Sequence, residues 1–500
     1  MTKIFTSSQV RAIDKYSIDN EPVESIDLME RAAKELFLSI YDNIGFEDRK
    51  FVIVAGCGNN GGDGLAIARL LYQQAVDVEA YFCDFSENIS NNCKVNLERL
   101  KNLCPKNIKI LTKPNDLIIP ENVIILDCLF GSGLSKPVGG KFAEIIHKIN
   151  KSENTVIAID IPSGLFGEDN SYNDGEIIEA DYTFTIQFPP ISSMFGENDK
   201  YYGKMFIVPI GLSHIAIENT ETDYFIPDID YIRQTVKKRK RFDHKGNFGH
   251  ALLIAGKYCS AGAAVLASKS CIRSGVGLLT VHVPKNLVDI LQISVPEAMI
   301  EKDQDDNIFT GTNLQSKCTA VGLGPGIGTD KETIIGLKKL LKNTDLPIVI
   351  DADGLNILSR IKNFMTLLKS GTILTPHPKE FERLFGKFDN SFQKMKFMQD
   401  FSFKTGVIIV LKGGISIISL PDKRIFFNTG GNPGMATGGS GDVLTGIITS
   451  FLAQSYKPED AALVSVYVHS KSGDCAAEKY RQISMIASDI IECLPEVFKF

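Results

Sequence analysis

The sequence lacks any cysteine pattern that would support a disulfide framework or a zinc site. Its ten cysteines are scattered from Cys57 to Cys493, with no CxxC pair and no cysteine–histidine metal spacing. Structural disulfides belong to oxidising compartments, so this distribution favours a reducing one. The segment 1–35 is too polar for a signal peptide, and no stretch reaches the roughly 18 consecutive apolar residues of a membrane helix. We therefore expect a cytoplasmic protein that has no membrane partner.

An excess of positive charge is also missing, which argues against nucleic acid as a partner. Lysine and arginine number 54 against 60 acidic residues, and the net charge is −6. The 44% hydrophobic and 23% charged residues are the ordinary balance of a soluble globular protein. Because 500 residues exceed what one hydrophobic core usually serves, we expect two or three domains. We also expect the chain to assemble as a homo-oligomer.

The first half of the chain alternates short apolar runs with helical patterns. Residues 51–55 form a β-rich run that ends in Gly56, and 64–75 carry apolar residues on one helical face. A further helix is predicted at 141–149. Further strands are predicted at 123–126, 155–159, 182–186 and 205–209. This alternation indicates an α/β fold, here a Rossmann-like, doubly wound parallel sheet with helices on both faces.

The second half begins a new α/β unit and does not repeat the first. A helix is predicted at 261–274, and a hairpin-like pair at 415–420 and 424–428. Two long helices, 441–454 and 458–479, are expected to close the domain. Strands are predicted at 250–255, 278–283, 320–323, 347–350, 372–374 and 407–411.

Between the halves, from 217 to 249, the apolar rhythm fades and a basic run, Lys237 to Arg241, appears. Such a run can be a nucleic-acid or localisation signal, but a solvated linker or a domain-contact segment agrees better with the acidic total. We predict a first domain at 1–216, a linker at 217–241 and a second domain at 242–500.

A glycine-rich loop, 55–64, lies between a predicted strand and a predicted helix. Its glycines match the G-x-G-x-x-G pattern of ordinary dinucleotide folds, and Asp77 or Glu79 lies near the offset of a ribose-binding acid. That single motif is weak evidence. Asp63 at the start of the helix is unfavourable for a bound pyrophosphate, which prefers positive potential there.

The same loop contains two consecutive asparagines, Asn59 and Asn60, whose amide and carbonyl groups can bind a ligand and an alkali cation. Alternatively, they only shape a turn and cap a helix. Two further predicted strands end in acids, Asp127 and Asp160, each followed by a glycine-containing loop. Ligands bind at the carboxyl ends of strands in open α/β sheets, so the three loops should form one crevice.

Taken together, Gly58–Gly64, the Asp127 loop and Asp160–Gly164 resemble the motifs of the NAD(P)H-hydrate epimerase family, and the early run Leu28–Ala32 also matches. The similarity covers about residues 7–211. It implies potassium binding by Asn60, Asp127 and Ser163, all oxygen ligands suited to a hard cation. Asp127 could be mainly an ion ligand or a proton-transfer group. The residues implied to hold the hydrated nucleotide are Asn59, Asn60, Gly61, Gly62, Asp63, Gly131, Ser132, Gly133, Leu134, Ser135, Lys136, Pro137 and Asp160.

A second glycine loop, 432–441, precedes Asp442 and an apolar helix. No G-x-x-x-x-G-K-[ST] run occurs in the chain, so this loop is not a P-loop. Its glycines would expose backbone N–H groups at a helix N-terminus, which is a ready anion site. Asp442 is placed to accept a proton or to bind a substrate hydroxyl; alternatively, it only caps the helix.

This arrangement resembles the ribokinase-like superfamily, whose members place a glycine loop and an aspartate against a phosphoryl donor. From about residue 242 onward, the finer match is with the ADP-dependent NAD(P)H-hydrate dehydratases. Matching motifs occur in order at 245–249, 260–264, 324–328, 351–356, 375–380 and 411–414. The implied substrate contacts are Ala263, Gly326, His377, Pro378, Lys379, Glu380, Phe381, Glu382, Arg383 and Asp442. The implied nucleotide contacts are Lys412, Gly413, Gly414, Ile415, Ser416, Asn432, Pro433, Gly434, Met435, Ala436, Thr437, Gly438, Gly439, Ser440 and Gly441.

Two positions depart from the family pattern. His377 stands where many ribokinase-like kinases carry asparagine before a magnesium-linked glutamate, and Glu380 is still the residue expected to bind Mg²⁺. His377 could instead be a packed loop histidine. Ile415 and Ser416 are expected to contact the nucleotide through their backbone alone.

The resemblance also implies a mechanism. A hydrated nicotinamide carries a hydroxyl on carbon 6 of the reduced ring, and hydroxide leaves poorly. A kinase-like site would phosphorylate that hydroxyl with ADP, with Asp442 as general base and the loop amides and Mg²⁺ stabilising the transferring group. Elimination of phosphate would then regenerate NADH or NADPH from the S epimer, giving AMP and phosphate. The first domain would interconvert the R and S epimers.

Two other functions compete with this one. A ribokinase-like small-molecule kinase with an N-terminal nucleotide-sensing domain would transfer phosphate from ATP to a stable alcohol. A non-enzymatic nucleotide sensor would bind without turnover. Neither accounts for both sets of motifs.

Overall fold

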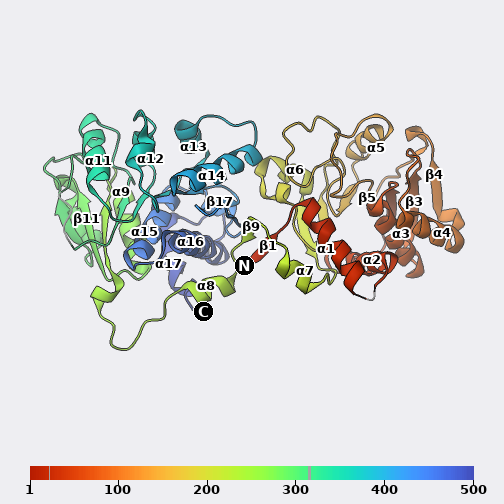
Figure 1. The fold of residues 1–500 in the computed structure, drawn as a ribbon, viewed down its shortest axis with the longest axis horizontal. Coiled ribbons are helices and arrows are strands. Elements are labelled where there is room, and N and C mark those ends of the chain that lie inside the picture. Colours follow the sequence, from red (N-terminus) through yellow and green to blue (C-terminus); the bar gives the residue numbers. More distant parts are fainter. Residues whose placement is uncertain (22, 313–316, 500) are drawn as a thin grey trace. The chain divides into compact units, whose positions relative to one another are not determined.

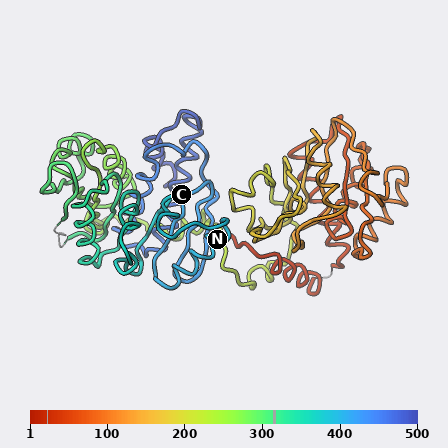
Figure 2. The backbone as a smooth tube through the Cα atoms, turned by 90° about the horizontal axis from the view of Figure 1, so that it is seen from above, coloured from red at the N-terminus to blue at the C-terminus, as the bar shows by residue number. Residues whose placement is uncertain are grey.

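The computed structural model describes residues 1–21, 23–312 and 317–499, which form two compact units. The N-terminal unit comprises Ile4–Thr222 with Asn390–Phe392, and the C-terminal unit comprises Asp223–Asp389, Gln393–Phe500 and Met1–Lys3. Each unit has its own sheet, as the ribbon shows (Figure 1). The backbone trace in Figure 2 follows the chain through both units. The chain passes from one unit to the other after Thr222, inside the segment 217–241, and the predicted domain ranges stay predictions.

The N-terminal unit is built on a parallel sheet with the strand order β4-β3-β2-β5-β6-β7-β8. Helices α2, α3 and α4 cover one face of this sheet and α5 covers the other, so the predicted doubly wound architecture is confirmed. The strands are β2 (Lys50–Ala55), β3 (Asp77–Cys83), β4 (Ile108–Leu111), β5 (Val123–Cys128), β6 (Thr155–Ile159), β7 (Tyr182–Ile186) and β8 (Lys204–Val208). The helices are α1 (Ser7–Asn20), α2 (Ser25–Ile44), α3 (Asn59–Gln73), α4 (Asn91–Leu103), α5 (Gly140–Asn150), α6 (Asp199–Tyr202) and α7 (His214–Asn219).

The position of two acids on β3 argues against interpreting the first glycine loop as an ordinary dinucleotide-binding loop. Asp77 and Glu79, the candidate ribose-binding acids, lie at the amino end of this strand. Glu79 is held there by Lys50 at 3.4 Å and by an ion pair with Lys109. A ribose-binding acid is needed at the carboxyl end, where ligands bind, so neither residue can serve in that role.

The C-terminal unit is built on a second sheet with the strand order β1-β9-β18-β17-β16-β15-β14-β13-β10-β11-β12. Most neighbours are parallel, and β16, β17 and β18 are antiparallel as the predicted hairpin requires. The strands are β1 (Thr2–Ile4), β9 (Tyr224–Ile226), β10 (His250–Ile254), β11 (Leu278–Val283), β12 (Met299–Lys302), β13 (Ala320–Leu323), β14 (Ile348–Ile350), β15 (Ile373–Leu374), β16 (Ile408–Leu411), β17 (Ser416–Ser419) and β18 (Ile425–Asn428).

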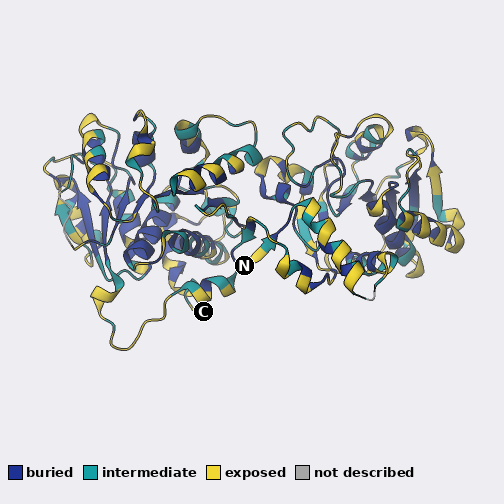
Figure 3. Ribbon diagram, viewed as in Figure 1, coloured by how far each residue is buried: buried dark blue, intermediate teal, exposed yellow. Residues whose placement is uncertain are grey.

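Helix α15 is the central helix of this unit and is buried along most of its length, packed against α9 and the strands (Figure 3). A third helix, α17, follows the two that were expected to close the domain. No helix within the described residues is long and apolar enough to cross a membrane. The helices are α8 (Ile229–Thr235), α9 (Ala261–Arg273), α10 (Val288–Ser294), α11 (Lys331–Asn343), α12 (Asp353–Leu358), α13 (Pro378–Phe385), α14 (Ser391–Thr405), α15 (Ser440–Ala453), α16 (Pro458–Tyr480) and α17 (Ala487–Val497).

The basic run 237–241 has a structural role in the C-terminal unit. The Lys237 Nζ donates to the carbonyl oxygens of Gln454 (3.0 Å) and Ser455 (2.9 Å), just beyond α15, and the Arg239 guanidinium donates to the carbonyl of Gly275, just beyond α9. Cations at helix C-termini satisfy unpaired carbonyls and oppose the helix dipole. A cavity of about 840 Å³ lies beside these helix ends, away from the carboxyl edge of the sheet.

Candidate active sites

The loops that follow β2, β5 and β6 lie side by side at the carboxyl edge of the N-terminal sheet. The chain runs from β2 outward to β3 and β4 and then returns to β5 on the other side of β2, so the strand order reverses there. Ligands bind open α/β sheets at such a reversal. A Cβ on Gly56 would lie 2.1 Å from the Leu129 carbonyl oxygen, so only glycine fits at this close approach. Gly61 and Gly62 are also buried, whereas Asn59 is exposed.

Asn60, Asp127 and Ser163 meet around the backbone of Phe130. The Asn60 Nδ2 donates to the Phe130 carbonyl oxygen at 2.8 Å, and the Ser163 Oγ lies 3.1 Å from the same oxygen. The Asp127 carboxylate accepts the backbone N–H of Ser163 at 2.8 Å and that of Leu129 at 3.2 Å. The three residues predicted to bind potassium therefore come from the start of α3, the end of β5 and the loop after β6, and they form one cluster.

This cluster has the donor set and the unpaired oxygen that a hard cation needs. Asn60 is buried, and its Oδ1 has no hydrogen-bond partner among the described residues. Burial raises the pKa of the Asp127 carboxyl to about 6, although the groups of Ser163 and Leu129 that donate to it oppose the shift. A cation here would complete the coordination of Asn60 Oδ1 and favour the ionised form of Asp127.

Asp160 ties the loop 131–137 to the end of β6. Its Oδ2 accepts the backbone N–H of Ser132 at 2.7 Å, and a Cβ on Gly131 would lie 2.7 Å from the same oxygen. The φ of Asp160 is +68°, a conformation that is uncommon for aspartate and recurs at functional sites. In the rest of this loop Leu134 is half-buried, and the exposed residues are Gly133, Ser135, Lys136 and Pro137.

Two further carboxyls lie close to Asp160, of which Asp63 is buried and Asp14 is half-buried. Asp63, in the first turn of α3, has its pKa raised well above the ordinary value by burial and by the nearby carboxyls of Asp160, Asp14 and Glu30. Burial and Asp160 also raise the pKa of Asp14, on α1, to about 6. Asp14 was missed by the sequence reasoning because no motif marks it: it lies on an amphipathic helix, far in sequence from the loops.

In the C-terminal unit, Lys412 and Asp351 form an ion pair at the carboxyl edge of the sheet. The Lys412 Nζ lies 2.7 Å from the Asp351 Oδ1, and the Thr445 hydroxyl of α15 donates to the Asp351 Oδ2 at 2.8 Å. Asp351 is only 1% exposed and directly follows β14. The rule that singled out Asp127, an acid placed directly after a buried strand, applies equally to Asp351 and could have found it.

Asp442 lies in the first turn of α15 and does not cap the helix. The N-cap is Gly439, and no side chain makes a capping hydrogen bond there. Burial, with the nearby carboxyls of Asp351 and Asp353, raises the pKa of Asp442 to about 6, and Lys412 opposes this shift. A carboxyl with a pKa close to neutrality can exchange a proton under physiological conditions, as a general base must.

The glycine loop before α15 is fixed to the body of the unit. The Asn432 Oδ1 accepts the N–H of Gly434 at 3.0 Å, and its Nδ2 donates to the carbonyl oxygen of Gly473 at 2.9 Å. Gly439 has a φ of +94°, and a Cβ there would lie 2.4 Å from the Leu266 Cδ1, so this position requires glycine. The residues of this loop that stay exposed are Pro433, Ala436 and Gly438, and those that are half-buried include Gly434, Met435 and Thr437.

The other predicted nucleotide segment, 412–416, lies next to the start of α15. A Cβ on Gly441 would be 3.3 Å from the Lys412 Nζ, and the carbonyl of Ser440 accepts the Nε2–H of His469 at 3.0 Å. Gly413 and Gly414 are exposed, while Ile415 and Ser416 are half-buried and lead into β17. The structure thus brings the turn after β16 together with the helix start that carries Asp442.

His377 is the N-cap of α13. Its Nδ1 accepts the backbone N–H groups of Lys379 (3.1 Å) and Glu380 (3.4 Å), and the Glu380 Oε2 accepts the N–H of His377 at 2.9 Å. This reciprocal capping box fixes the histidine at the start of α13. Because Nδ1 is an acceptor, the ring proton is on Nε2, which lies 3.4 Å from the Glu380 Oε1. Burial and the cations Lys412 and Arg383 lower the pKa of His377.

The remaining predicted substrate residues fall into two groups. Ala263 and Gly326 are neighbours, since a Cβ on Gly326 would lie 3.1 Å from the Ala263 Cβ. By contrast, the Phe381 side chain is fully buried against Phe385 and so belongs to the core. On the outer side of α13, Pro378, Lys379 and Arg383 are exposed and Glu382 is half-buried.

The two sheets and their carboxyl-edge sites define a class of protein: a two-module α/β enzyme that handles nucleotides, whose second module is ribokinase-like. Comparison with known proteins makes the identification more specific. Residues 251–496 match the family model described as NAD(P)H-hydrate dehydratase, and 25–191 match the one described as YjeF-related protein N-terminus. The chain belongs to the family of bifunctional NAD(P)H-hydrate repair enzymes.

Relatives of this family match the chain almost from end to end. The bifunctional NAD(P)H-hydrate repair enzyme Nnr of Coxiella burnetii is 33% identical over 496 residues, which cover 98% of either chain. That of Moorella thermoacetica is 30% identical over 512 residues, covering 99% of this chain and 96% of the relative. A solved structure of the ADP/ATP-dependent NAD(P)H-hydrate dehydratase of Bacillus subtilis, co-crystallised with ATP and Mg²⁺, is 29% identical with a TM-score of 0.49, and covers 55% of this chain and 98% of that one.

Proposed function

We propose that the protein repairs hydrated NADH and NADPH. The N-terminal unit interconverts the R and S hydrates, and the C-terminal unit uses ADP to dehydrate the S hydrate to NADH or NADPH, giving AMP and phosphate. The observation that carries the proposal is the placement of Asp442, a carboxyl with a pKa of about 6, behind a glycine loop and beside Lys412. It occurs in a chain that matches bifunctional repair enzymes over 98–99% of its length.

Dehydration then follows from the residues around α15. Asp442 accepts the proton of the carbon-6 hydroxyl as the hydroxyl oxygen attacks the terminal phosphorus of ADP, and AMP leaves. Lys412, held by Asp351, and the N–H groups at 438–441 stabilise the charge of the transferring group. The ring nitrogen then expels phosphate from carbon 6, carbon 5 loses a proton, and the dihydronicotinamide is restored.

Glu380 is the residue that we assign to magnesium. Its Oε2 is used in the capping box, whereas its Oε1 lies 3.4 Å from the Nε2 of His377 and keeps lone pairs for a metal. A magnesium ion at this carboxylate would neutralise part of the charge on the phosphates of ADP.

Epimerisation is assigned to the cluster at the carboxyl edge of the N-terminal sheet. Asn60, Asp127 and Ser163 supply the oxygens for potassium, while 59–63, 131–137 and Asp160 hold the hydrated nucleotide. The unpaired Oδ1 of Asn60 supports the potassium assignment. A potassium ion would keep Asp127 ionised and the loops that meet at Phe130 ordered.

We further propose that the protein acts in the cytoplasm as a homo-oligomer. All ten cysteines are free, and nine of them are buried or half-buried, which agrees with a reducing compartment. Light scattering of the purified protein gives its mass, and a monomer at micromolar concentration would contradict the oligomer.

One experiment tests the proposed reaction. Hydrated NADH is incubated with the protein and ADP, and recovery of dihydronicotinamide absorbance is followed together with the release of AMP. A small-molecule kinase would consume ATP without restoring this absorbance, and a sensor would bind without turnover. We expect recovery that depends on the protein and is faster with ADP than with ATP at saturation. The absence of recovery with either nucleotide would remove the proposal.

A further inference from the structure

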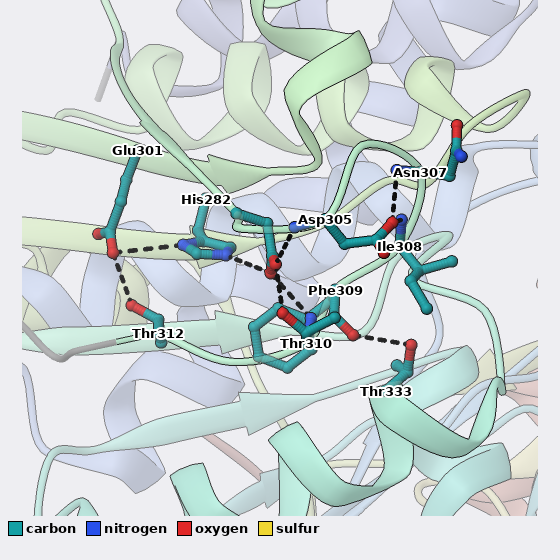
Figure 4. A network of polar contacts seen from close by, with 10 residues as sticks. His282, Glu301, Asp305, Asn307, Ile308, Phe309, Thr310, Thr312 and Thr333 are labelled. Atoms are coloured by element: carbon teal, nitrogen blue, oxygen red, sulfur yellow. Dashed lines mark hydrogen bonds and ion pairs between the residues drawn. The ribbon is translucent and has the colours of Figure 1, made fainter.

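A buried charged network lies at the far edge of the C-terminal sheet, outside the residues assigned above (Figure 4). His282 on β11 is the register partner of Glu301 on β12, and Asp303 follows two residues later, so that both carboxyls face the same ring. The His282 Nε2 lies 2.9 Å from the Asp303 Oδ2, and its Nδ1 lies 3.4 Å from the Glu301 Oε1. His282 and Asp303 are each only 2% exposed.

This environment favours the charged form of the imidazole although the ring is buried. Burial by itself lowers the pKa of a histidine, but Asp303 and Glu301 outweigh it and raise the pKa of His282 above its ordinary value. The same contacts hold the pKa of Asp303 well below its usual range. Asp305, whose backbone N–H donates to Asp303, and the thiol of Cys318 also lie close to this network. Burial and Glu301 raise the pKa of Cys318.

Asp303 also organises the loop that follows β12. Its Oδ2 accepts the backbone N–H of Thr310 at 2.8 Å, and its Oδ1 accepts that of Asp305 at 3.0 Å. The Phe309 ring meets His282 edge-on at 5.4 Å, and the Phe309 carbonyl accepts the Thr333 hydroxyl of α11 at 2.9 Å. One buried ion pair therefore sets the path of the backbone from 303 to 310.

That backbone supports a wall of the proposed dehydratase site. The carbonyl oxygen of Asn307 accepts the N–H of Tyr258 at 2.8 Å, and Tyr258 lies in the loop 256–260 between β10 and α9. On its other side this loop touches the substrate residues: a Cβ on Gly326 would lie 3.2 Å from the Ser260 carbonyl oxygen and 3.1 Å from the Ala263 Cβ.

We propose that the His282–Asp303 pair is a positioning device for the dehydratase: it holds the loop 256–260 against Ala263 and Gly326 and so sets the affinity for the hydrated nicotinamide. The pair does not touch the substrate. The pair is connected through Asn307 and Tyr258 to the part of the site that is proposed to bind the hydrate. The part that is proposed to bind ADP is formed by 412–416 and 432–441. The inference rests on the proposed function of the C-terminal unit.

The test replaces the charge and keeps a hydrogen-bond donor, in the full chain, with His282→Gln. We expect the KM for the S hydrate to rise about tenfold to a hundredfold, because small displacements of a positioning wall have effects of this size. The KM for ADP and the rate of epimerisation should stay within about twofold of the parent. A device that only stabilised the fold would move both KM values together or neither.

Two further variants make the result specific. His250→Gln is the matched control, since His250 is a buried histidine of the same sheet that pairs with the Thr280 hydroxyl at 2.8 Å and, among the described residues, with no carboxylate. We expect this variant to leave the KM for the hydrate unchanged. The double variant His282→Gln/Asp303→Asn removes both charges and should recover part of the lost affinity, because the single variant leaves Asp303 buried and uncompensated.

The pH dependence provides a second readout. In the parent, the KM for the hydrate should rise as the pH rises through the pKa of His282. This pH-dependent rise in KM should be absent in His282→Gln. Asp303→Asn is measured in the same way if His282→Gln does not fold. An unchanged KM for the hydrate, or equal changes for hydrate and ADP, would overturn the inference. A parent protein that shows no dehydration at all would overturn the proposed function instead.

Discussion

Three aspartates with the same raised pKa lie in different surroundings, and each environment indicates a different test. Asp442 lies between Lys412 and other carboxyls at a helix start, and Asp127 accepts backbone N–H groups inside a cluster of neutral oxygens. Asp14 is half-buried near Asp160. Burial is the largest cause of the shift in all three. Only the first two are assigned a chemical role here.

Replacing Asp442 by asparagine should abolish dehydration and leave epimerisation intact. A general base contributes roughly 10²–10⁴-fold, and the amide cannot accept the hydroxyl proton. In the parent, kcat/KM for dehydration should fall as the pH drops through about 6, where Asp442 becomes protonated. Rates of both reactions are measured on purified S and R hydrates. If the folded variant dehydrates at nearly the parental rate, Asp442 is not the base.

Replacing Asp127 by alanine should remove epimerisation and its response to potassium, whereas the S hydrate is still dehydrated. The Asp127 carboxylate and the Oδ1 of Asn60 are the strongest oxygen ligands for potassium in the cluster. We expect the loss of the Asp127 carboxylate to disorder the loops that meet at Phe130. The assay gives pure R or pure S hydrate to the variant with ADP, in potassium or in a bulky organic cation. Processing of the R hydrate at the parental rate would show that this site is assigned wrongly.

At the scale of elements, the start of α15 is the structural centre of the C-terminal unit. The helix is apolar and buried, and Gly439 turns the chain into it with a φ of +94°. The same few residues present backbone N–H groups, place Asp442 and pack against α9 through Leu266. A change at this junction should therefore affect stability and nucleotide binding together.

Gly439→Ala tests this junction, and Gly438→Ala is its matched control. A methyl group at 439 meets Leu266 at 2.4 Å and is strained by the positive φ, whereas at 438 nothing lies within 4 Å. We expect Gly439→Ala to lower the free energy of unfolding of the C-terminal unit by about 1–3 kcal/mol and to raise the KM for ADP. Gly438→Ala should leave the unfolding transition in place. Equal unfolding transitions for the two variants, followed by calorimetry, would refute the argument.

At the scale of the whole molecule, the raised pKa values make the unliganded protein more stable in mild acid. A carboxyl whose pKa is raised on folding binds its proton more tightly in the folded state, so the stability it contributes is complete below the unfolded pKa and is lost as the pH rises through the folded one. Asp14, Asp127 and Asp442 all have folded values of about 6. His282 acts in the same direction, whereas His469, His377 and His250, whose pKa values burial lowers, act in the opposite one. Asp303, with a lowered pKa, acts only at much lower pH.

We therefore expect these carboxyls to raise the Tm of the free protein as the pH is lowered from about 6 to about 4, the interval that lies between their folded and unfolded pKa values. Asp127→Asn and Asp442→Asn should each flatten this dependence, because the amide does not titrate. Thermal unfolding followed by fluorescence at constant ionic strength measures it. Equal slopes of Tm against pH in the parent and in the two variants would mean that these carboxyls ionise as freely in the folded state as in the unfolded one.

Much of this architecture follows from the sequence alone, because hydrophobic periodicity and glycine placement are local properties. The strands at β6, β7, β11 and β13 have the predicted bounds, and the acids that end strands, Asp127 and Asp160, were found by position. Tertiary structure alone decided the short strands β1, β9 and β12, which depend on pairing with a partner more than on their own few residues.

The tertiary structure alone also decided which charged side chains lie close together. His282 faces Glu301 because β12 pairs with β11 in one register. Asp14 lies close to Asp160 because α1 packs against the loops. Lys412 and Asp351 form an ion pair although they follow different strands of the sheet. Ion pairs and pKa values depend on distances between residues that are remote in the chain. Composition and motif spacing therefore predicted the type of reaction. Only the tertiary structure determines which side chains lie close enough together to carry it out.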